Sequence, residues 1–289
     1  MKIAVASGKG GTGKTTLSTN LAYLAAQAGR SVAYADCDVE ATHGHLFLTP
    51  TITGESSIDR LFPAVDLVRC VRWGRCAEAC RFGAIACVGR SVLVFPELCH
   101  ACGGCKLACP EAAISESPRT IGRVRRGNSG PVSFVDGWLN VGEAMSPPAI
   151  RAVKEALPHD VELVFLDCPP GTSCPAIESV RGANFVLLVT EPTPFGRHDL
   201  DLAIQMTRVL NLPLGVVVNR ADIGDRQVWD ACDHQQVPIL AELPEDREVA
   251  RAYSQGRLAA ADVPRLATSL RGLLRVLETS DFAADRAVA

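Results

Sequence analysis

Short apolar runs alternate with helix-length segments along most of the chain. The runs lie at residues 2–6, 31–35, 162–166, 185–189 and 214–218. A strand that is apolar throughout, and not only at every second position, is typical of a parallel sheet with helices on both faces. We therefore expect an α/β fold built on a doubly wound, mostly parallel sheet.

The expected helices have favourable residues at their ends. A helix predicted over residues 15–27 is followed by Gly29, and Ser146 with Pro147 opens another at residues 149–157. Residues 264–279 place leucines on one helical face and arginines elsewhere. Such a helix can lie on an anionic membrane, but we expect its leucines to pack against the sheet.

The pattern is interrupted between residues 63 and 117, where cysteines and short turns surround a small strand at residues 91–95. We interpret this stretch as an inserted domain. Residues 121–126 and 131–137 then flank Gly-containing residues 127–130, which predicts a hairpin that returns the chain to the main sheet. The expected organisation is a main domain in two parts, residues 1–62 and 118–279, an insert at 63–117 and a frayed tail at 280–289.

Composition narrows the class of protein. The 289 residues are 47% hydrophobic, which allows a substantial core, and the net charge of −3 with 5% aromatic residues gives no sign of nucleic-acid binding. The chain begins with a strand and a glycine-rich loop, and no apolar run approaches the roughly 20 residues that span a bilayer. We expect a cytoplasmic protein without a membrane partner, in which twelve cysteines favour metal binding over disulfides.

The segment GKGGTGKTT follows a predicted strand and opens a predicted helix, which is the context of a phosphate-binding P-loop. Its glycines allow backbone N–H groups to face phosphate oxygens, Lys14 can reach the terminal phosphates, and Thr15 can bind magnesium. Lys9 is a second cation on the loop, and it could contact the phosphates of a neighbouring subunit. The candidate nucleotide-binding residues of the loop are Gly8, Gly10, Gly11, Thr12, Gly13, Lys14, Thr15 and Thr16.

These residues resemble the deviant Walker A loop, KGGxGKT, of the MinD/ParA/Mrp superfamily of P-loop ATPases. The resemblance covers most of the chain and implies a P-loop NTPase fold that binds ATP and Mg²⁺, hydrolyses ATP slowly without a partner, and pairs with a second copy or a similar ATPase. Two subunits of such proteins sandwich two ATP molecules, and Lys9 matches the signature lysine of the family.

Further residues match the switch segments of that superfamily. In YADCDVE, Asp38 would orient the attacking water and Asp36 would lie near Lys14 and magnesium. In VFLDCPPGTS, Asp167 would hold magnesium through water. In VVVNRADIGD, Asn219 would read the adenine base, with Asp222 as an accessory. The resemblance thus assigns catalysis to Lys9, Lys14 and Asp38.

Eight of the twelve cysteines lie between residues 70 and 109. Cys99, Cys102, Cys105 and Cys109, followed by Pro110, reproduce the C-x2-C-x2-C-x3-C-P run of bacterial ferredoxins. Upstream, the same spacing is occupied by Cys70, Trp73, Cys76 and Cys80. Both halves continue alike, as CRFGAI and CPEAAI, so the insert resembles a small α+β two-cluster ferredoxin. A zinc site is the less expected alternative.

In such ferredoxins the fourth cysteine of each run binds the other cluster. The resemblance then implies a 4Fe-4S cluster on Cys80, Cys99, Cys102 and Cys105. The second cluster keeps Cys70, Cys76 and Cys109, because the indole N–H of Trp73 can only donate a hydrogen bond. This site could hold a 3Fe-4S cluster or a 4Fe-4S cluster whose labile iron binds solvent or Cys87, or it could be empty.

Four cysteines lie outside the insert, and we expect small buried thiols there, with a redox or bridging role of Cys168 and Cys174 as the less expected alternative. They are Cys37, Cys168, Cys174 and Cys232. The whole pattern resembles MinD-superfamily ATPases with an inserted ferredoxin domain. We expect an ATP-hydrolysing iron–sulfur protein whose nucleotide-dependent dimer state gates electron transfer to an unknown redox partner. The alternatives are an iron–sulfur carrier or scaffold that serves an apo-protein, and a MinD-like positioning ATPase with structural or redox-sensing clusters.

Overall fold

The structure is a computed structural model, and it describes residues 1–143 and 145–279. The expected tail at residues 280–289 lies outside these described residues. The strands are β1 (Lys2–Ala6), β2 (Val32–Asp36), β3 (Thr51–Val65), β4 (Ile85–Val88), β5 (Ser91–Val94), β6 (Ile114–Ser129), β7 (Val132–Leu139), β8 (Leu163–Asp167), β9 (Phe185–Thr190), β10 (Leu214–Asn219) and β11 (Ile239–Leu243). The helices are α1 (Lys14–Gln27), α2 (Gly44–Leu48), α3 (Arg75–Ala79), the 3-10 turn Pro96–Leu98, α4 (Gly104–Leu107), α5 (Pro147–Glu155), α6 (Cys174–Val180), α7 (Pro194–Val209), α8 (Gln227–His234), α9 (Arg247–Ser254), α10 (Ala259–Asp262) and α11 (Pro264–Thr279).

The main sheet has the strand order β11-β10-β9-β1-β8-β2-β7-β6-β3. Neighbours from β11 to β7 pair in parallel, and β6 and β3 extend the sheet in antiparallel pairs. The five predicted apolar runs correspond to β1, β2, β8, β9 and β10. The expected mostly parallel α/β sheet is therefore confirmed.

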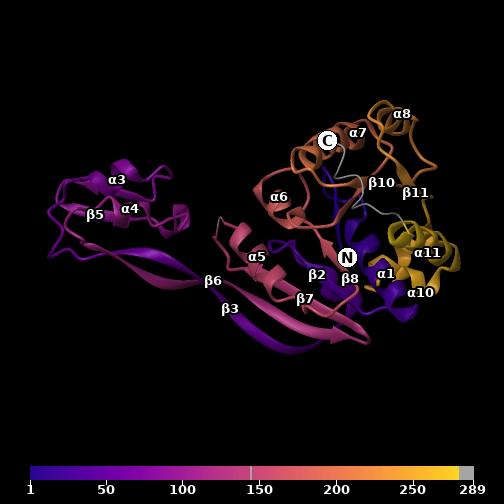
Figure 1. The fold of residues 1–289 in the computed structure, drawn as a ribbon, viewed down its shortest axis with the longest axis horizontal. Coiled ribbons are helices and arrows are strands. Elements are labelled where there is room, and N and C mark those ends of the chain that lie inside the picture. Colours follow the sequence, from indigo (N-terminus) through magenta and orange to yellow (C-terminus); the bar gives the residue numbers. More distant parts are fainter. Residues whose placement is uncertain (144, 280–289) are drawn as a thin grey trace.

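Helices cover both faces of this sheet (Figure 1). Because successive side chains of a strand point to opposite faces, Ile3 and Val5 of β1 pack with α1 and α11, whereas Ala4 and Ala6 pack with α5, α6 and α7. Both faces of the central strands are thus removed from water. This explains why these strands are apolar at every position and not only at alternate ones.

The predicted hairpin after the insert is confirmed as β6 and β7, which pair from Ser129 and Val132 to Gly122 and Leu139. The sequence analysis missed β3, which pairs with β6 along its whole length to form a long two-stranded ribbon. Most residues of β3 are exposed, and its sequence, TITGESSIDRLFPAV, contains no long apolar run. The pattern of apolar residues therefore did not predict a strand at residues 51–65.

The ribbon carries a small lobe at the end away from the main sheet (Figure 1). The lobe comprises residues 66–113 and contains α3, α4 and the β4–β5 hairpin. Its small core is built on Cys76 and Ile85 together with Ile114 at the start of β6, and four further cysteines and three valines are packed around them. The expected insert, residues 63–117, contains this lobe and the adjoining ends of β3 and β6.

The loop at Cys99 and His100 in the lobe lies close to the ribbon and to the start of α5. The guanidinium of Arg60 on β3 donates to the carbonyl of His100 (3.2 Å). Cys99 and His100 line a small cavity together with Pro148 at the start of α5. The loop that begins the second cysteine run and the first turn of α5 therefore border the same small cavity.

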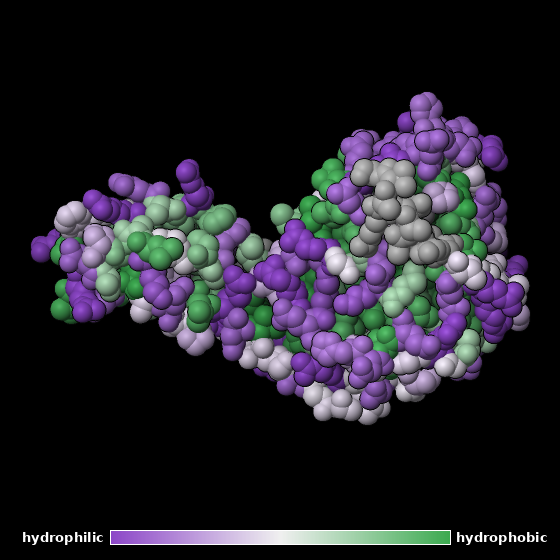
Figure 2. Space-filling view, viewed as in Figure 1, coloured by the Kyte–Doolittle hydropathy of each residue, from purple (hydrophilic) through white to green (hydrophobic). Residues whose placement is uncertain are grey.

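Apolar side chains are unusually frequent on the surface of the lobe, as Figure 2 shows by the green residues among purple ones. The exposed large apolar residues of this region are Leu67, Val68, Val71, Trp73, Phe82, Val88, Leu93, Phe95, Leu98 and Leu107. By contrast, four leucines of α11 are buried against α1 and the sheet and Leu266 is half-buried there, so the expected packing of this helix is confirmed. Within the described residues no helix is both long and apolar enough to cross a bilayer.

Candidate functional site

The carboxyl ends of the central parallel strands bring the predicted switch residues together. Asp36 ends β2, Asp167 ends β8 and Asn219 ends β10, and the glycine-rich loop follows β1 in the middle of this set. Parallel neighbours end at the same edge of a sheet, which is where α/β proteins bind their ligands. Residues more than 200 positions apart in the sequence therefore surround one loop.

The backbone of the glycine-rich loop, residues 8–13, curves into a concave anion-binding conformation, called the cradle below. Gly11 and Gly13 have φ values of 80° and 95°, a conformation that strongly favours glycine, and a Cβ at Gly13 would lie 2.6 Å from Asn219 Nδ2. Helix α1 starts at Lys14, so its free N–H groups and the positive end of its dipole face the loop. The loop is thus shaped to accept an anion such as phosphate.

The Lys14 ammonium lies inside this cradle and donates to Ser7 Oγ (2.8 Å). Its burial lowers the pKa of Lys14, and the nearby carboxylates of Asp167 and Asp38 oppose this effect. Among the described residues Lys14 forms no ion pair, and its hydrogen bond to a neutral hydroxyl leaves its charge available for an anionic ligand. This position suits the contact with terminal phosphates that the sequence predicts.

Asp167 is the candidate magnesium residue at the end of β8, and it is buried. Its Oδ2 accepts from the Tyr34 hydroxyl (2.9 Å), whereas its Oδ1 has no hydrogen-bond partner among the described residues. Burial raises the pKa of Asp167, and the neighbouring hydroxyls of Thr15 and Tyr34 oppose this. A buried carboxylate oxygen without a partner, beside the hydroxyl of Thr15, fits a magnesium ion with its bound water.

Asp36 organises the segment after β2. Its carboxylate accepts from the backbone N–H groups of Asp38 (3.1 Å), His43 (3.0 Å) and Gly44 (2.8 Å). Burial and then the charge of Asp167 raise the pKa of Asp36 well above its ordinary value. Asp36 therefore shapes the loop that holds Asp38 and also lies within electrostatic reach of the candidate magnesium residue.

Asp38 faces a cavity of about 300 Å³ that is open beside the sheet edge. The cavity is lined by the Asp38 loop, by Pro169 and Pro170 after β8, and by Ser146 and Ile150 of the α5 region. Burial raises the pKa of Asp38, with a further contribution from Asp167. A carboxylate in this setting is suited to hold a water molecule and its proton.

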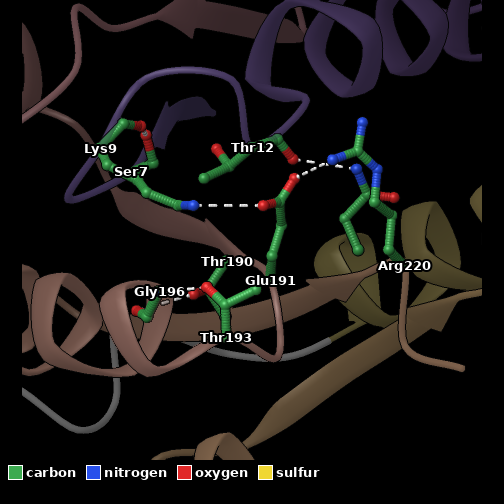
Figure 3. A network of polar contacts seen from close by, with 9 residues as sticks. Ser7, Lys9, Thr12, Thr190, Glu191, Thr193, Gly196 and Arg220 are labelled. Atoms are coloured by element: carbon green, nitrogen blue, oxygen red, sulfur yellow. Dashed lines mark hydrogen bonds and ion pairs between the residues drawn. The ribbon is translucent and has the colours of Figure 1, made fainter. Parts of the chain in front are cut away.

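Lys9 belongs to a charged network at the same edge, in which Figure 3 shows Glu191 between two cations. Lys9 Nζ lies 3.2 Å from Glu191 Oε2, and Arg220 Nη1 lies 2.7 Å from Glu191 Oε1. Next to Arg220, the Asn219 amide donates to the carbonyl of Thr12 (2.9 Å). In the single chain, Lys9 is thus held by a carboxylate of its own subunit.

Sequence reasoning did not identify Ser7, Tyr34, Glu191 or Arg220. Glu191 follows β9, which lies next to β1 in the sheet, so a carboxylate at the end of an apolar strand was the available signal. Arg220 directly follows Asn219 and has a positive φ of 54°. Ser7 and Tyr34 carry no motif, and only the packed structure reveals their contacts. Asp222 accepts from the backbone N–H of Glu245 (2.6 Å) at the edge of this region.

The cysteines of the lobe surround two separate cavities. Cys80, Cys99, Cys102 and Cys105 line one of them. Cys70, Cys76, Cys87 and Cys109 line the other, together with Trp73. Apart from the addition of Cys87, the two groups coincide with the two ligand sets of the sequence analysis.

Several of these sulfur atoms accept backbone hydrogen bonds. The N–H groups of Ala84, Ala101 and Ala113 donate to Cys80 Sγ (3.3 Å), Cys99 Sγ (3.4 Å) and Cys109 Sγ (3.3 Å). Such bonds favour a thiolate, which is the form that binds metal, and they tune iron–sulfur clusters. The donor set therefore fits iron–sulfur clusters.

No three Cys, His, Asp or Glu side chains of the described residues converge as the ligands of one metal ion would. The thiols surround spaces of about 30 Å³ each, so a cluster would have to move them outward. Burial and the nearby thiol of Cys87 raise the pKa of Cys76 to about 11. Metal binding at this cysteine would therefore have to displace a firmly held proton.

The cysteines outside the lobe fit the sequence interpretation with one exception. Cys37, Cys168 and Cys232 are buried, as expected. Cys174 is exposed at the start of α6, so the expectation of a buried thiol is wrong there. The reason is its place in the first turn of a short helix, whose buried side is formed by Ala176, Ser179 and Val180.

Comparison with known proteins agrees with this geometry. Residues 3–259 match the family model of the CobQ/CobB/MinD/ParA nucleotide binding domain. An uncharacterized protein of Methanocaldococcus jannaschii is 33% identical over 78% of this chain and 80% of its own. An iron-sulfur cluster carrier protein of Rickettsia bellii is 25% identical over 48% of each chain. The septum site-determining protein MinD from Pyrococcus horikoshii, solved with Mg-ADP, has a TM-score of 0.61 at 20% identity and covers 100% of this chain and 99% of its own. The chain therefore belongs to the CobQ/CobB/MinD/ParA family of nucleotide-binding proteins.

Proposed function

We propose that this protein is an ATP-hydrolysing switch whose lobe holds two iron–sulfur clusters, and that the nucleotide-dependent dimer state gates electron transfer by those clusters. The observation that carries the proposal is the division of the lobe cysteines between two cavities, in a chain that also contains the phosphate loop. The proposal is developed below for the nucleotide end, the lobe and the connection between them.

At the nucleotide end, Lys14 and the backbone of the loop would bind the phosphates, and Thr15 with Asp167 would hold Mg²⁺. The metal ion would supply neutralisation of the phosphate charge. Asp38 faces the open cavity and would orient the attacking water, while Asn219 would read the base. Lys9 would leave Glu191 and reach the nucleotide of a second subunit, which is either another copy or a similar ATPase.

In the lobe, Cys80, Cys99, Cys102 and Cys105 would hold one 4Fe-4S cluster, and Cys70, Cys76 and Cys109 would contribute to the other. The apolar surface around these cavities supports the docking of a protein partner, because an exposed cluster of apolar residues is typical of interaction sites. The lobe projects from the main domain on its ribbon, so a partner could approach it without covering the phosphate loop (Figure 1).

Helix α5 supports communication between the two ends. Ile150 of this helix and the preceding Ser146 line the cavity beside Asp38. Pro148, two residues before Ile150, lines a second, small cavity together with Cys99 and His100 of the lobe. Closure of the Asp38 cavity around nucleotide would press on the first turn of α5, which shares a small cavity with the cluster loop. Such gating requires that ATP bind the closed arrangement more tightly than the open one.

The test is anaerobic purification, followed by counts of iron and sulfide and by EPR of the reduced protein with and without Mg·ATP. We expect iron in the lobe, bound nucleotide, and an EPR spectrum that changes with ATP. A protein that lacks iron after reconstitution would exclude the clusters. If the clusters are present but their EPR spectrum and rate of reduction do not change with ATP, gating of electron transfer by nucleotide would be excluded.

Delivery of a cluster is the second candidate function, and the similarity to the carrier protein of Rickettsia bellii favours it. Cys102 is exposed, so one thiolate of the first set could be approached by an acceptor. Incubation with a cluster-free acceptor protein separates the two functions. A carrier would lose iron to the acceptor, whereas an electron-transfer protein would reduce an acceptor and keep its own iron.

A further inference from the structure

We propose that Cys87 is the fourth thiolate ligand of the cluster beside Trp73, which makes this site a complete 4Fe-4S site. This inference rests on the proposed function, because it presupposes that the lobe binds iron–sulfur clusters. The cysteine run predicts a ligand at position 73, where the chain has Trp73. The structure supplies a thiol from a different element of the same lobe.

Four thiols line the cavity in question, namely those of Cys70, Cys76, Cys87 and Cys109. Cys87 Sγ lies 3.9 Å from Cys76 Sγ, so the sulfur atoms of these two cysteines are neighbours. A 4Fe-4S cluster takes one thiolate for each of its four irons. The four thiols around this one cavity therefore satisfy the need for four thiolate ligands, whereas the repeated cysteine spacing supplies only three.

The hairpin explains why Cys87 faces inward. Side chains on β4 alternate between the two faces of the hairpin, and Ile85, two residues earlier, is buried in the lobe core with Cys76. Val88 is exposed on the other face. Cys87 shares the inward face with Ile85, and it is packed against the same core.

A further contact holds the hairpin beside the first cysteine run. Arg72 Nε donates to the carbonyl of Arg90 (2.7 Å), which lies in the turn between β4 and β5. Arg72 has a positive φ of 64° and directly precedes Trp73. The strand that carries Cys87 is thereby joined to the segment from which the usual cysteine is missing.

Trp73 fits the role of a cover and not that of a ligand. Its indole can only donate a hydrogen bond, and its side chain is 58% exposed with the Arg75 guanidinium 5.2 Å from the ring centre. It also lines the cavity beside Cys87. A bulky ring at this position would shield the cluster from water while Cys87 binds the fourth iron.

The ligation step is balanced without an oxidant or a reductant. Cys87 loses its thiol proton to solvent, a sulfur–iron bond forms, and the water or hydroxide on that iron leaves. Neither iron nor sulfur changes oxidation state in this exchange. Only the competing product, a disulfide between Cys76 and Cys87, would require the removal of two electrons together with two protons, and therefore an oxidant.

The experiment compares the anaerobically reconstituted full-length wild type with Cys87→Ala by iron count, EPR and Mössbauer spectroscopy. We expect about eight irons per chain in the wild type, as two 4Fe-4S clusters require. In Cys87→Ala the iron count should fall by about one eighth, with the EPR signal of an oxidised 3Fe-4S cluster, or by about one half if the whole cluster is lost. Cys174→Ala, which removes an exposed thiol outside the lobe, is the matched control and should keep all of its iron.

The double variant Trp73→Cys with Cys87→Ala distinguishes ligation from structural damage. It restores the spacing of the other cysteine run, and we expect it to recover the full iron count and to lose the 3Fe-4S signal. If it recovers nothing, the effect of Cys87→Ala is structural and the proposal is wrong.

Two further results would overturn the ligand role of Cys87. One is a 3Fe-4S signal of equal size in wild type and Cys87→Ala, which would leave the proposed function intact. The other is a Cys76–Cys87 disulfide in the anaerobic protein, found by mass spectrometry. A wild type without iron would instead refute the proposed function itself.

Discussion

Replacement of Glu191 by glutamine tests the role of Lys9 most directly. Glu191 is nearly buried and binds Lys9 and Arg220 in the single chain. If Lys9 acts on the nucleotide of a second subunit, its bond to Glu191 must break when the dimer forms. We therefore expect Glu191→Gln to favour the ATP-bound dimer, because the neutral amide holds Lys9 less strongly.

The size of the expected gain in dimer stability follows from the solvent exposure of the Lys9–Glu191 ion pair. The Lys9 and Glu191 side chains are 29% and 7% exposed, and their charged atoms lie 3.2 Å apart. Because Lys9 is partly exposed, we take the stabilisation by this ion pair as about 1 kcal/mol, which is the upper end of the values for surface ion pairs. A symmetric dimer breaks two such pairs, so the variant should gain about 2 kcal/mol, which is about a 30-fold lower dimer dissociation constant.

Sedimentation velocity over a range of protein concentrations, with a non-hydrolysable ATP analogue and Mg²⁺, measures this constant. Glu55→Gln is a suitable control, because Glu55 pairs with the single cation Arg123 (2.7 Å) on the ribbon, away from the phosphate loop. Lys9→Ala should abolish the gain when it is combined with Glu191→Gln. An unchanged or weaker dimer of Glu191→Gln would refute the idea that Glu191 restrains Lys9.

Three other substitutions test separate parts of the structure. Arg60→Ala removes the bond to the His100 carbonyl, so the ATP-induced change in the EPR spectrum should disappear. The affinity for nucleotide, measured by calorimetry, should stay the same. If the EPR spectrum still changed with ATP, this contact would be excluded from the gating route. Tyr34→Phe removes a buried hydrogen bond to Asp167 and should lower the free energy of unfolding, measured in urea, by roughly 1–3 kcal/mol. An unchanged midpoint of the urea unfolding curve would contradict this stabilising role. The pKa of Asp246 is lowered, first by its bond to Arg265, so this carboxylate stabilises the fold above its ordinary pKa and the stabilisation is lost as pH falls through the lowered value. Asp246→Asn should therefore be less stable than wild type at pH 7, and thermal melts should show the difference closing below about pH 4; a constant difference would refute this assignment.

The sequence was informative where local chemistry determines structure. Strands buried on both faces are apolar throughout, and a loop with glycine at positive φ must precede the helix that begins at Lys14. Both features could be predicted from neighbouring residues alone. The ribbon could not, because β3 is largely exposed and is stabilised by its pairing with β6, whose register partners lie 49 to 77 residues away along the chain.

The candidate site shows the same limit. Asp38 and Asp167 were predicted from motifs, whereas the partner of Lys9 lies 182 residues away and depends on β9 being the neighbour of β1. The position of Cys87 likewise depends on the hairpin of β4 and β5, which brings a cysteine outside the repeated spacing to the cavity beside Trp73. Contacts of this kind arise from the order of strands and not from any local pattern.

The ribbon has a consequence for how such a chain can be built and altered. Val65 and Ile114 are direct register partners, so the chain enters and leaves the lobe at one point. Residues 66–113 therefore form a cassette, and a two-residue Asn-Gly turn between these partners would close the ribbon as an ordinary β-hairpin. The path of the chain through the nucleotide-binding domain would stay the same. A different small domain whose two ends lie close together could be grafted at this junction.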